Sequence, residues 1–236
     1  MTLAPTPLVH ARVLDAWDET PTQRAVRLQL PPEAAGAHRA PGQVLKLHTV
    51  AGEAYFALAS APDPGGVIDL LVKRGGRVAD AAVAAALPGA GLDVTPPFGT
   101  GFPFEEGHGR HLLLFAAGSG IAPIRALVQH VLSHRDAFDR VTLFHGQRRG
   151  TDFAYHKEHL GWERGGVRVV LCPSQEDDAW PGVRGRVQEV ARSLGFGGSP
   201  PESSVAFVCG MTAMVDDVKA TLARAGIPPE RVHLNF

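Results

Sequence analysis

Cysteine is scarce in this chain of 236 residues, and so is any excess of charge. The two cysteines, Cys172 and Cys209, exclude a disulfide framework and are too few for a four-cysteine iron–sulfur site. The formal net charge of −1 is not the basic footprint that nucleic acid or a membrane surface attracts. We therefore expect neither nucleic acid nor a membrane among the partners.

Long apolar runs and targeting signals are also missing. No apolar stretch reaches membrane length, and the first ten residues lack the basic and apolar regions of a signal peptide. These features predict a cytoplasmic protein. The sequence contains neither a Gly-x-Ser-x-Gly elbow nor a P-loop lysine, which argues against hydrolases and P-loop nucleotidases.

The most informative stretch is residues 111–127. Leu112–Phe115 is a short apolar run typical of a central parallel strand, and a turn of small residues follows it. A helix is predicted next, because apolar residues recur at helical spacing at Ile124, Leu127, Val128, Val131 and Leu132. Backbone N–H groups at such a helix start bind phosphate, so Gly118–Pro123 predicts a nucleotide site. A tight strand–helix turn without a ligand is the alternative.

The two halves of the chain differ in pattern. Alternating apolar and polar residues at 26–30, 45–48 and 68–73, separated by Pro/Gly turns, predict an antiparallel β-barrel. One helix interrupts it at 78–87, and the Gly75-Gly76 pair before it is a second candidate anion site. From residue 109, strand-like runs alternate with helices expected near 123–134, 152–162, 184–194 and 213–225, which is typical of a parallel α/β sheet.

Several short stretches carry motifs in a fixed order. They are Pro41–Gln43, Phe56–Ser60, Leu71–Arg74, Pro97–Phe102, Gly118–Pro123, Trp180–Val187 and Val208–Val215. In this order they resemble the ferredoxin–NADP reductase-like flavoproteins over nearly the whole chain. The turn at Gly118–Pro123 resembles the nicotinamide-domain turn of that superfamily, since the common dinucleotide fingerprint needs a small residue in place of Pro123.

The resemblance implies a two-domain protein. Residues 1–108 form a β-barrel that binds FAD, and residues 109–236 form an α/β domain that binds NAD or NADP. Hydride then passes between nicotinamide C4 and flavin N5. The implied catalytic positions are Ala57, Cys209 and Phe236. The implied cofactor-binding positions are Phe56, Ala57, Leu58, Ala59, Ser60, Lys73, Gly76, Arg77, Val78, Ala79, Gly118, Gly120, Ile121, Ala122, Pro123, Arg148, Cys209, Gly210 and Met211.

The flavin motif departs from the family pattern. Ala54 replaces the arginine that contacts the flavin phosphate, Phe56 replaces a tyrosine, and Ala57 replaces the serine whose hydroxyl reaches flavin N5. Arg77 and Val78 occupy the Ser/Thr positions of the phosphate loop. Arg77 either supplies the missing charge or is an ordinary solvated arginine. The backbone N–H groups of residues 76–79 remain available in both cases.

The nucleotide motifs depart as well. Cys209 resembles the cysteine beside the nicotinamide, or is a small buried hydrophobe, and Met211 stands where a proline is usual. Arg148 either reaches the adenosine end or is an exposed loop arginine. Gln175 stands where NADP-preferring relatives often have arginine, and acidic residues follow at 176–178. We expect NAD rather than NADP.

Two histidine pairs and the chain end remain. His130/His134 and His156/His159 have metal-pair spacing, but without a carboxylate motif a solvated helix face is preferred and no metal is expected. Alternation of Val232 and Leu234 predicts a last strand, after which Phe236 stacks on the flavin or belongs to a frayed end.

The sequence thus predicts a flavin-dependent oxidoreductase that takes hydride from NAD(P)H onto FAD and passes electrons to an unidentified acceptor, a separate protein or a small molecule. A nucleotide-binding module without flavin is the first alternative, because Ala54, Phe56 and Ala57 remove family contacts. An electron-transfer subunit of a larger complex is the second.

Overall fold

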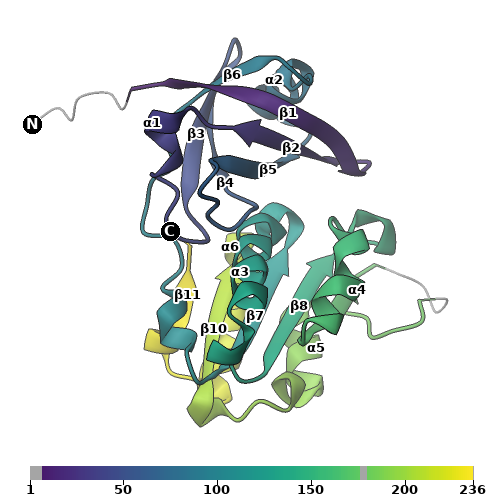
Figure 1. The fold of residues 1–236 in the computed structure, drawn as a ribbon. Coiled ribbons are helices and arrows are strands. Elements are labelled where there is room, and N and C mark those ends of the chain that lie inside the picture. Colours follow the sequence, from purple (N-terminus) through teal and green to yellow (C-terminus); the bar gives the residue numbers. More distant parts are fainter. Residues whose placement is uncertain (1–6, 176–179, 236) are drawn as a thin grey trace, which may run out of the picture.

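Alternating apolar residues in the first half of the chain build a six-stranded antiparallel sheet (Figure 1). The structure is a computed structural model that describes residues 7–175 and 180–235. The strands are β1 (Val9–Thr20), β2 (Gln23–Gln29), β3 (Val44–Thr49), β4 (Gly52–Ala57), β5 (Val67–Lys73) and β6 (Gly91–Val94), in the order β4-β3-β6-β1-β2-β5. An antiparallel bridge from Leu58 to Leu70 joins the two edges, which closes the sheet into the predicted barrel.

The alternation places one face of each barrel strand inside. Leu28, Leu45, Leu47 and Leu70 are at most 1% exposed and form one core cluster. Two helices accompany the barrel, α1 (Pro32–Ala35) and α2 (Arg77–Ala85), and α2 packs Ala82 into that core. The helix expected at 78–87 is therefore confirmed, one residue earlier at its start and two residues shorter at its end.

The second half of the chain forms a five-stranded parallel sheet. Its strands are β7 (His111–Ala117), β8 (Val141–Gln147), β9 (Val167–Pro173), β10 (Ser204–Cys209) and β11 (Val232–Leu234), in the order β11-β10-β7-β8-β9. Its α-helices are α3 (Ile121–Ser133), α4 (His156–Arg164), α5 (Val187–Ser193) and α6 (Thr212–Arg224). Single-turn 3₁₀ helices lie between them: η1 (Phe104–Gly107), η2 (Gly118–Gly120), η3 (Arg135–Ala137), η4 (Gly150–Asp152), η5 (Gly195–Gly198), η6 (Pro201–Ser203) and η7 (Pro229–Arg231).

Helices cover both faces of the parallel sheet, as expected for a strand buried on both sides. Along β7, Leu112 and Leu114 pack with α3 and α4, whereas Leu113 and Phe115 pack with α5 and α6. Figure 1 shows α3 and α4 on the near face. The α/β domain predicted from the sequence is confirmed, including the short last strand β11 beside β10.

The strand order indicates the edge of the parallel sheet at which a ligand would bind. From β7 the chain first adds β8 and β9 on one side, and then adds β10 and β11 on the other. The connections after β7 and β10 therefore lead in opposite directions, and open α/β sheets bind ligands at the carboxyl ends of such a pair.

The two sheets are joined by residues 95–110, which include η1. Phe104 of η1 lies against His130 of α3 with ring centroids 4.1 Å apart, and Phe102 meets Phe207 of β10 edge-on at 5.5 Å. The last strand of the barrel, β6, ends at Val94, and the first strand of the parallel sheet, β7, begins at His111. We propose that the boundary between the two domains lies after residue 108.

Candidate active site

The turn after β7 has the features of a phosphate site. Gly118 has a left-handed backbone (φ +60°), and no atom lies within 4 Å of the position a Cβ would occupy. Among the described residues, no side chain caps η2 or α3, so no side chain occupies the N–H groups at this helix start. Pro123 lies in the first turn of α3, where its missing N–H costs nothing.

Gly120 allows the turn after β7 to pack closely against the end of β10. It is fully buried, and a Cβ there would overlap the carbonyl oxygen of Cys209 and lie 2.9 Å from the backbone nitrogen of Gly210. Its missing side chain therefore lets α3 begin directly against the end of β10. The open side of the turn belongs to Gly118, and the predicted role of Gly120 in binding the nucleotide stays a prediction.

The end of β10 lies beside the turn that follows β7. Cys209 pairs with Ala116 of β7, which brings the two predicted nucleotide motifs together. Cys209 is half-buried, and burial raises the pKa of its thiol to about 12, so the sulfur is neutral at physiological pH and is no thiolate nucleophile. Gly210 leaves space for the methyl group of Met214, and Met211 is 72% exposed at the rim.

The predicted flavin strand lies at the end of β4. Phe56 and Ala57 are half-buried, whereas the side chains of Leu58 and Ala59 are fully enclosed. The N–H of Leu58 donates to the Gln43 carbonyl at 2.9 Å and that of Ala59 to the Asp69 carbonyl at 2.7 Å. Leu58 and Ala59 therefore offer neither a side chain nor an N–H group to a cofactor. The accessible positions of this strand are Phe56, Ala57 and Ser60.

The second anion site opens at α2. Gly76 precedes the helix with extended backbone, and no side chain caps the helix within the described chain. Arg77 and Lys73 are exposed beside this helix start, while Asp80 accepts the N–H of Gly75 at 2.9 Å. Val78 lies against the β3–β4 turn, next to Gly52. Backbone N–H groups with two nearby cations form a donor set that suits a diphosphate.

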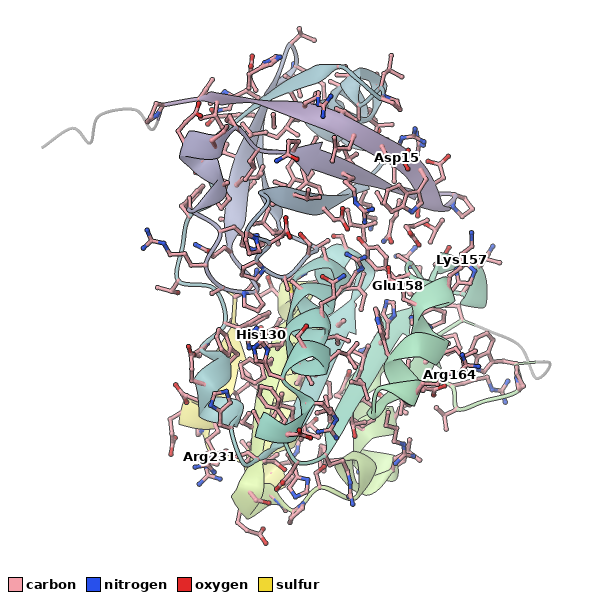
Figure 2. The ribbon with its side chains drawn as sticks, in the orientation of Figure 1. Asp15, His130, Lys157, Glu158, Arg164 and Arg231 are labelled. Atoms are coloured by element: carbon pink, nitrogen blue, oxygen red, sulfur yellow. The ribbon has the colours of Figure 1, made fainter. Side chains whose placement is uncertain are left out.

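One group of residues at the junction was missed by sequence reasoning. Arg125 of α3 is only 4% exposed, yet it lies between the two sheets and bonds three acceptors. It donates to both carboxylate oxygens of Glu158 at 2.8–3.0 Å, to Asp69 Oδ2 at 3.1 Å and to the Ala59 carbonyl at 2.7 Å. Figure 2 shows Glu158 at the barrel end of α4, with Arg164 at the other end.

Charges are balanced in this group. Arg27 of β2 holds Asp69 with two hydrogen bonds of 2.8 and 3.0 Å, so two arginines alternate with two carboxylates. Burial alone lowers the pKa of Arg125, but the hydrogen bonds to Glu158 and the charges of Glu158 and Asp69 outweigh it and raise the pKa. Arg125 is therefore a permanent buried cation.

The start of α4 is tied to the barrel as well. Tyr155 has a left-handed backbone (φ 60°), which is why α4 begins at His156 rather than near residue 152. The Tyr155 N–H donates to Glu19 Oε2 at 2.7 Å, and its ring lies 4.5 Å from the Arg125 guanidinium. The β1–β2 hairpin thus reaches across the junction and fixes the residue before α4.

The histidine pairs are not a solvated face throughout, which corrects the expectation. His159 is buried against Trp162 and faces the fully buried His145 of β8, with ring centroids 6.0 Å apart. His130, which Figure 2 shows on α3, is half-buried, and its ring lies against that of Phe104. Among the described residues, no group of three histidine, cysteine or acidic side chains could hold a metal ion.

The adenosine end is partly described. Arg148 is exposed after β8, and its carbonyl accepts the Gln175 N–H at 2.8 Å, so the two loops considered for nucleotide choice are neighbours. The acidic residues 176–178 and Phe236 lie outside the described residues. The roles of all predicted site residues remain predictions.

Comparison with known proteins agrees with this geometry. Residues 114–220 match the family described as "Oxidoreductase NAD-binding domain". A barrel joined to this domain defines a class, the oxidoreductases that use a nicotinamide nucleotide. A ferredoxin NADP⁺ reductase from Neisseria gonorrhoeae shares the fold, with a TM-score of 0.80, 19% identity and 97% and 99% of the two chains covered. The chain is thus similar in fold to the ferredoxin–NADP reductase-like proteins.

Two relatives are similar in sequence. The sulfhydrogenase 1 subunit gamma of Pyrococcus furiosus is 29% identical, over 98% of this chain and 80% of its own length. The reductase component of propane 2-monooxygenase from Rhodococcus jostii is 28% identical, over 96% of this chain. The chain spans only 63% of that second relative. Within the described residues, no helix is long and apolar enough to cross a membrane.

Proposed function

We propose that this protein binds FAD and NADH and passes electrons from NADH to a separate acceptor protein. The observation that carries the proposal is the bond from Arg125 to the Ala59 carbonyl at 2.7 Å. It holds the strand suited to a flavin against the helix whose first turn is suited to a nucleotide. When bound, the flavin supplies hydride acceptance from the nicotinamide and the onward transfer of electrons.

The residues of the chain bind and orient. The start of α3 and the exposed turn at Gly118 receive the dinucleotide phosphates, and the start of α2 with Arg77 receives those of FAD. Arg77 then supplies the positive charge that Ala54 lacks. Cys209 acts as a neutral packing group beside the nicotinamide, because its raised pKa leaves it protonated. Phe236 is proposed to cover the flavin until the nicotinamide displaces it.

The acceptor is proposed from the names of the relatives. One is a subunit of a sulfhydrogenase and the other the reductase component of a monooxygenase, so both names describe one part of a larger enzyme. The sequence itself has only two cysteines, too few for a four-cysteine iron–sulfur cluster. We therefore propose an acceptor protein that carries its own redox centre, in the cytoplasm.

A nucleotide-binding module without flavin is the second candidate. It is favoured by the alanines at positions 54 and 57, which offer no hydrogen bond to a flavin. A visible spectrum of the purified protein supplied with FAD, recorded anaerobically before and after NADH, separates the two candidates. A protein-bound flavin band that NADH bleaches supports the oxidoreductase, and dithionite serves as the positive control. Failure to retain FAD would refute it and leave the binding module.

A further inference from the structure

Helix α3 is part of both predicted cofactor sites. Its first residues follow the Gly118–Gly120 turn, and Arg125 and Gln129 lie one and two turns further along. Arg125 bonds the Ala59 carbonyl, and Gln129 Oε1 accepts the N–H of Ala61 at 2.9 Å. Since a helix rises 1.5 Å per residue, Arg125 lies about 7.5 Å along the axis from Gly120. One rigid element therefore connects the nucleotide turn to the flavin strand.

The segment after β4 is held from two sides. The barrel takes the N–H groups of Leu58 and Ala59, and α3 takes the Ala59 carbonyl and the Ala61 N–H. Ser60 Oγ accepts the Asp69 N–H at 3.0 Å. Ala57, the position proposed to face flavin N5, directly precedes this fixed segment. A shift of α3 against the segment therefore moves the nucleotide turn relative to Ala57.

The orientation of Arg125 is over-determined. Its guanidinium is a planar fork, and Glu158, Asp69 and the Tyr155 ring hold that fork from three directions. Lysine has a single point charge and cannot make these bonds together. The side chain that donates the hydrogen bond to the Ala59 carbonyl is therefore held in one orientation.

We propose that Arg125, assisted by Gln129, is a positioning residue that sets the distance between the hydride donor and the hydride acceptor. This inference rests on the proposed function. In the step concerned, the C4–H bond of NADH breaks, its hydride carries two electrons to flavin N5, NADH becomes NAD⁺ and the flavin is reduced. Arg125 neither gains nor loses a proton. It acts through the Ala59 carbonyl, and a misplacement of about 1 Å costs about 100-fold in rate.

The test compares Arg125→Met and Arg125→Lys with the wild type, each loaded with FAD. Arg24→Met is the matched control, because Arg24 of β2 forms a 2.9 Å ion pair with the exposed Asp18 of β1, so both partners belong to the barrel. Stopped-flow reduction at saturating NADH gives the hydride-transfer rate, and deuterated NADH verifies that this step is measured. The long-wavelength charge-transfer absorbance reports stacking of nicotinamide on flavin. Hydrogen exchange of residues 57–66 reports the contact itself, without turnover.

We expect Arg125→Met to slow hydride transfer about 100-fold, to weaken the charge-transfer band and to speed exchange at 57–66. Arg125→Lys falls between it and the wild type, while NADH affinity stays close to the wild-type value in both variants. Arg24→Met keeps the wild-type rate. A folded Arg125→Met protein with the wild-type rate and charge-transfer band overturns the inference, because a purely structural role lowers stability alone.

A milder pair decides the matter if Arg125→Met does not fold. Gln129→Met removes the acceptor for the Ala61 N–H, whereas Gln129→Glu keeps an oxygen there. We expect Gln129→Met to slow hydride transfer about tenfold, the factor that one hydrogen bond supplies, and Gln129→Glu to restore the rate. Equal rates in these two variants overturn the inference. A wild-type protein that binds FAD but is not reduced by NADH overturns the proposed function instead, and this is visible before any variant is made.

Discussion

Three buried histidines make the stability of this protein depend on pH. His38, His145 and His159 are each at most 8% exposed, and burial lowers their pKa values from 6.5 to about 4, 3 and 4. Asp63 opposes the shift at His38. The neighbouring His159 lowers the pKa of His145 further, and His156 does the same to the pKa of His159. In the unfolded chain each imidazole takes up a proton near pH 6.5, but the folded protein keeps it neutral until well below pH 5.

The sign and the size follow from linkage. Below pH 6.5 the unfolded state binds more protons than the folded state, so the free energy of unfolding decreases as the pH falls towards 4. At pH 5 the difference is about 1.5 pH units, which amounts to about 2 kcal/mol for each histidine. The three together cost about 6 kcal/mol, a large part of the ~5–15 kcal/mol that stabilises a folded protein.

Urea unfolding followed by tryptophan fluorescence at pH 7 and pH 5 measures this loss. The variant His38→Leu removes one titrating group and is expected to reduce the difference between the two pH values by about 2 kcal/mol. Ile68→Val is the control, because trimming a fully buried β5 side chain costs about 1 kcal/mol at both pH values. Equal unfolding free energies of the wild type at pH 7 and pH 5 would refute the reasoning.

Three further predictions concern the site. Gly120→Ala is expected to lower the free energy of unfolding by about 1–3 kcal/mol, because its Cβ meets the Cys209 carbonyl; a melting curve like that of the wild type would count against this packing. Ala57→Ser is expected to speed flavin reduction by NADH in stopped flow, since a hydroxyl adds a hydrogen bond near N5, and an unchanged or slower rate would argue that N5 already has a partner. NADH is expected to give a higher kcat/KM than NADPH, because acidic residues follow Gln175; a tenfold preference for NADPH would instead identify Arg148 as the phosphate ligand.

Local patterns were enough to predict most of the fold. In strands and amphipathic helices the side-chain period is fixed by the backbone, so Leu45 and Leu47 on β3 and Ile124 and Leu127 on α3 indicate the buried face directly. The parallel direction of the strands in the second sheet was predictable from the alternation of strands and helices. Gly118 was also predictable, because a left-handed turn before a helix needs glycine.

Residues whose role depends on distant partners were not predictable. Arg125 lies in a helix that is otherwise apolar from 121 to 128, which was the one available signal, but its partners are 33 to 66 residues away in sequence. His159 looked like a surface residue because the sequence does not show that His145 and Trp162 surround it. The close packing at Gly120 was not predictable for the same reason, since its neighbour Cys209 is distant in the sequence.

Asp69 takes part in two closures at once. Its backbone joins β5 to Ala59 and Ser60 along the seam of the barrel, and its carboxylate meets Arg125 from the other sheet. Opening the seam therefore also removes a counter-ion from a buried cation, which costs several kcal/mol more than opening an ordinary strand edge. Local opening at this end of the barrel is therefore coupled to the contact between the two sheets.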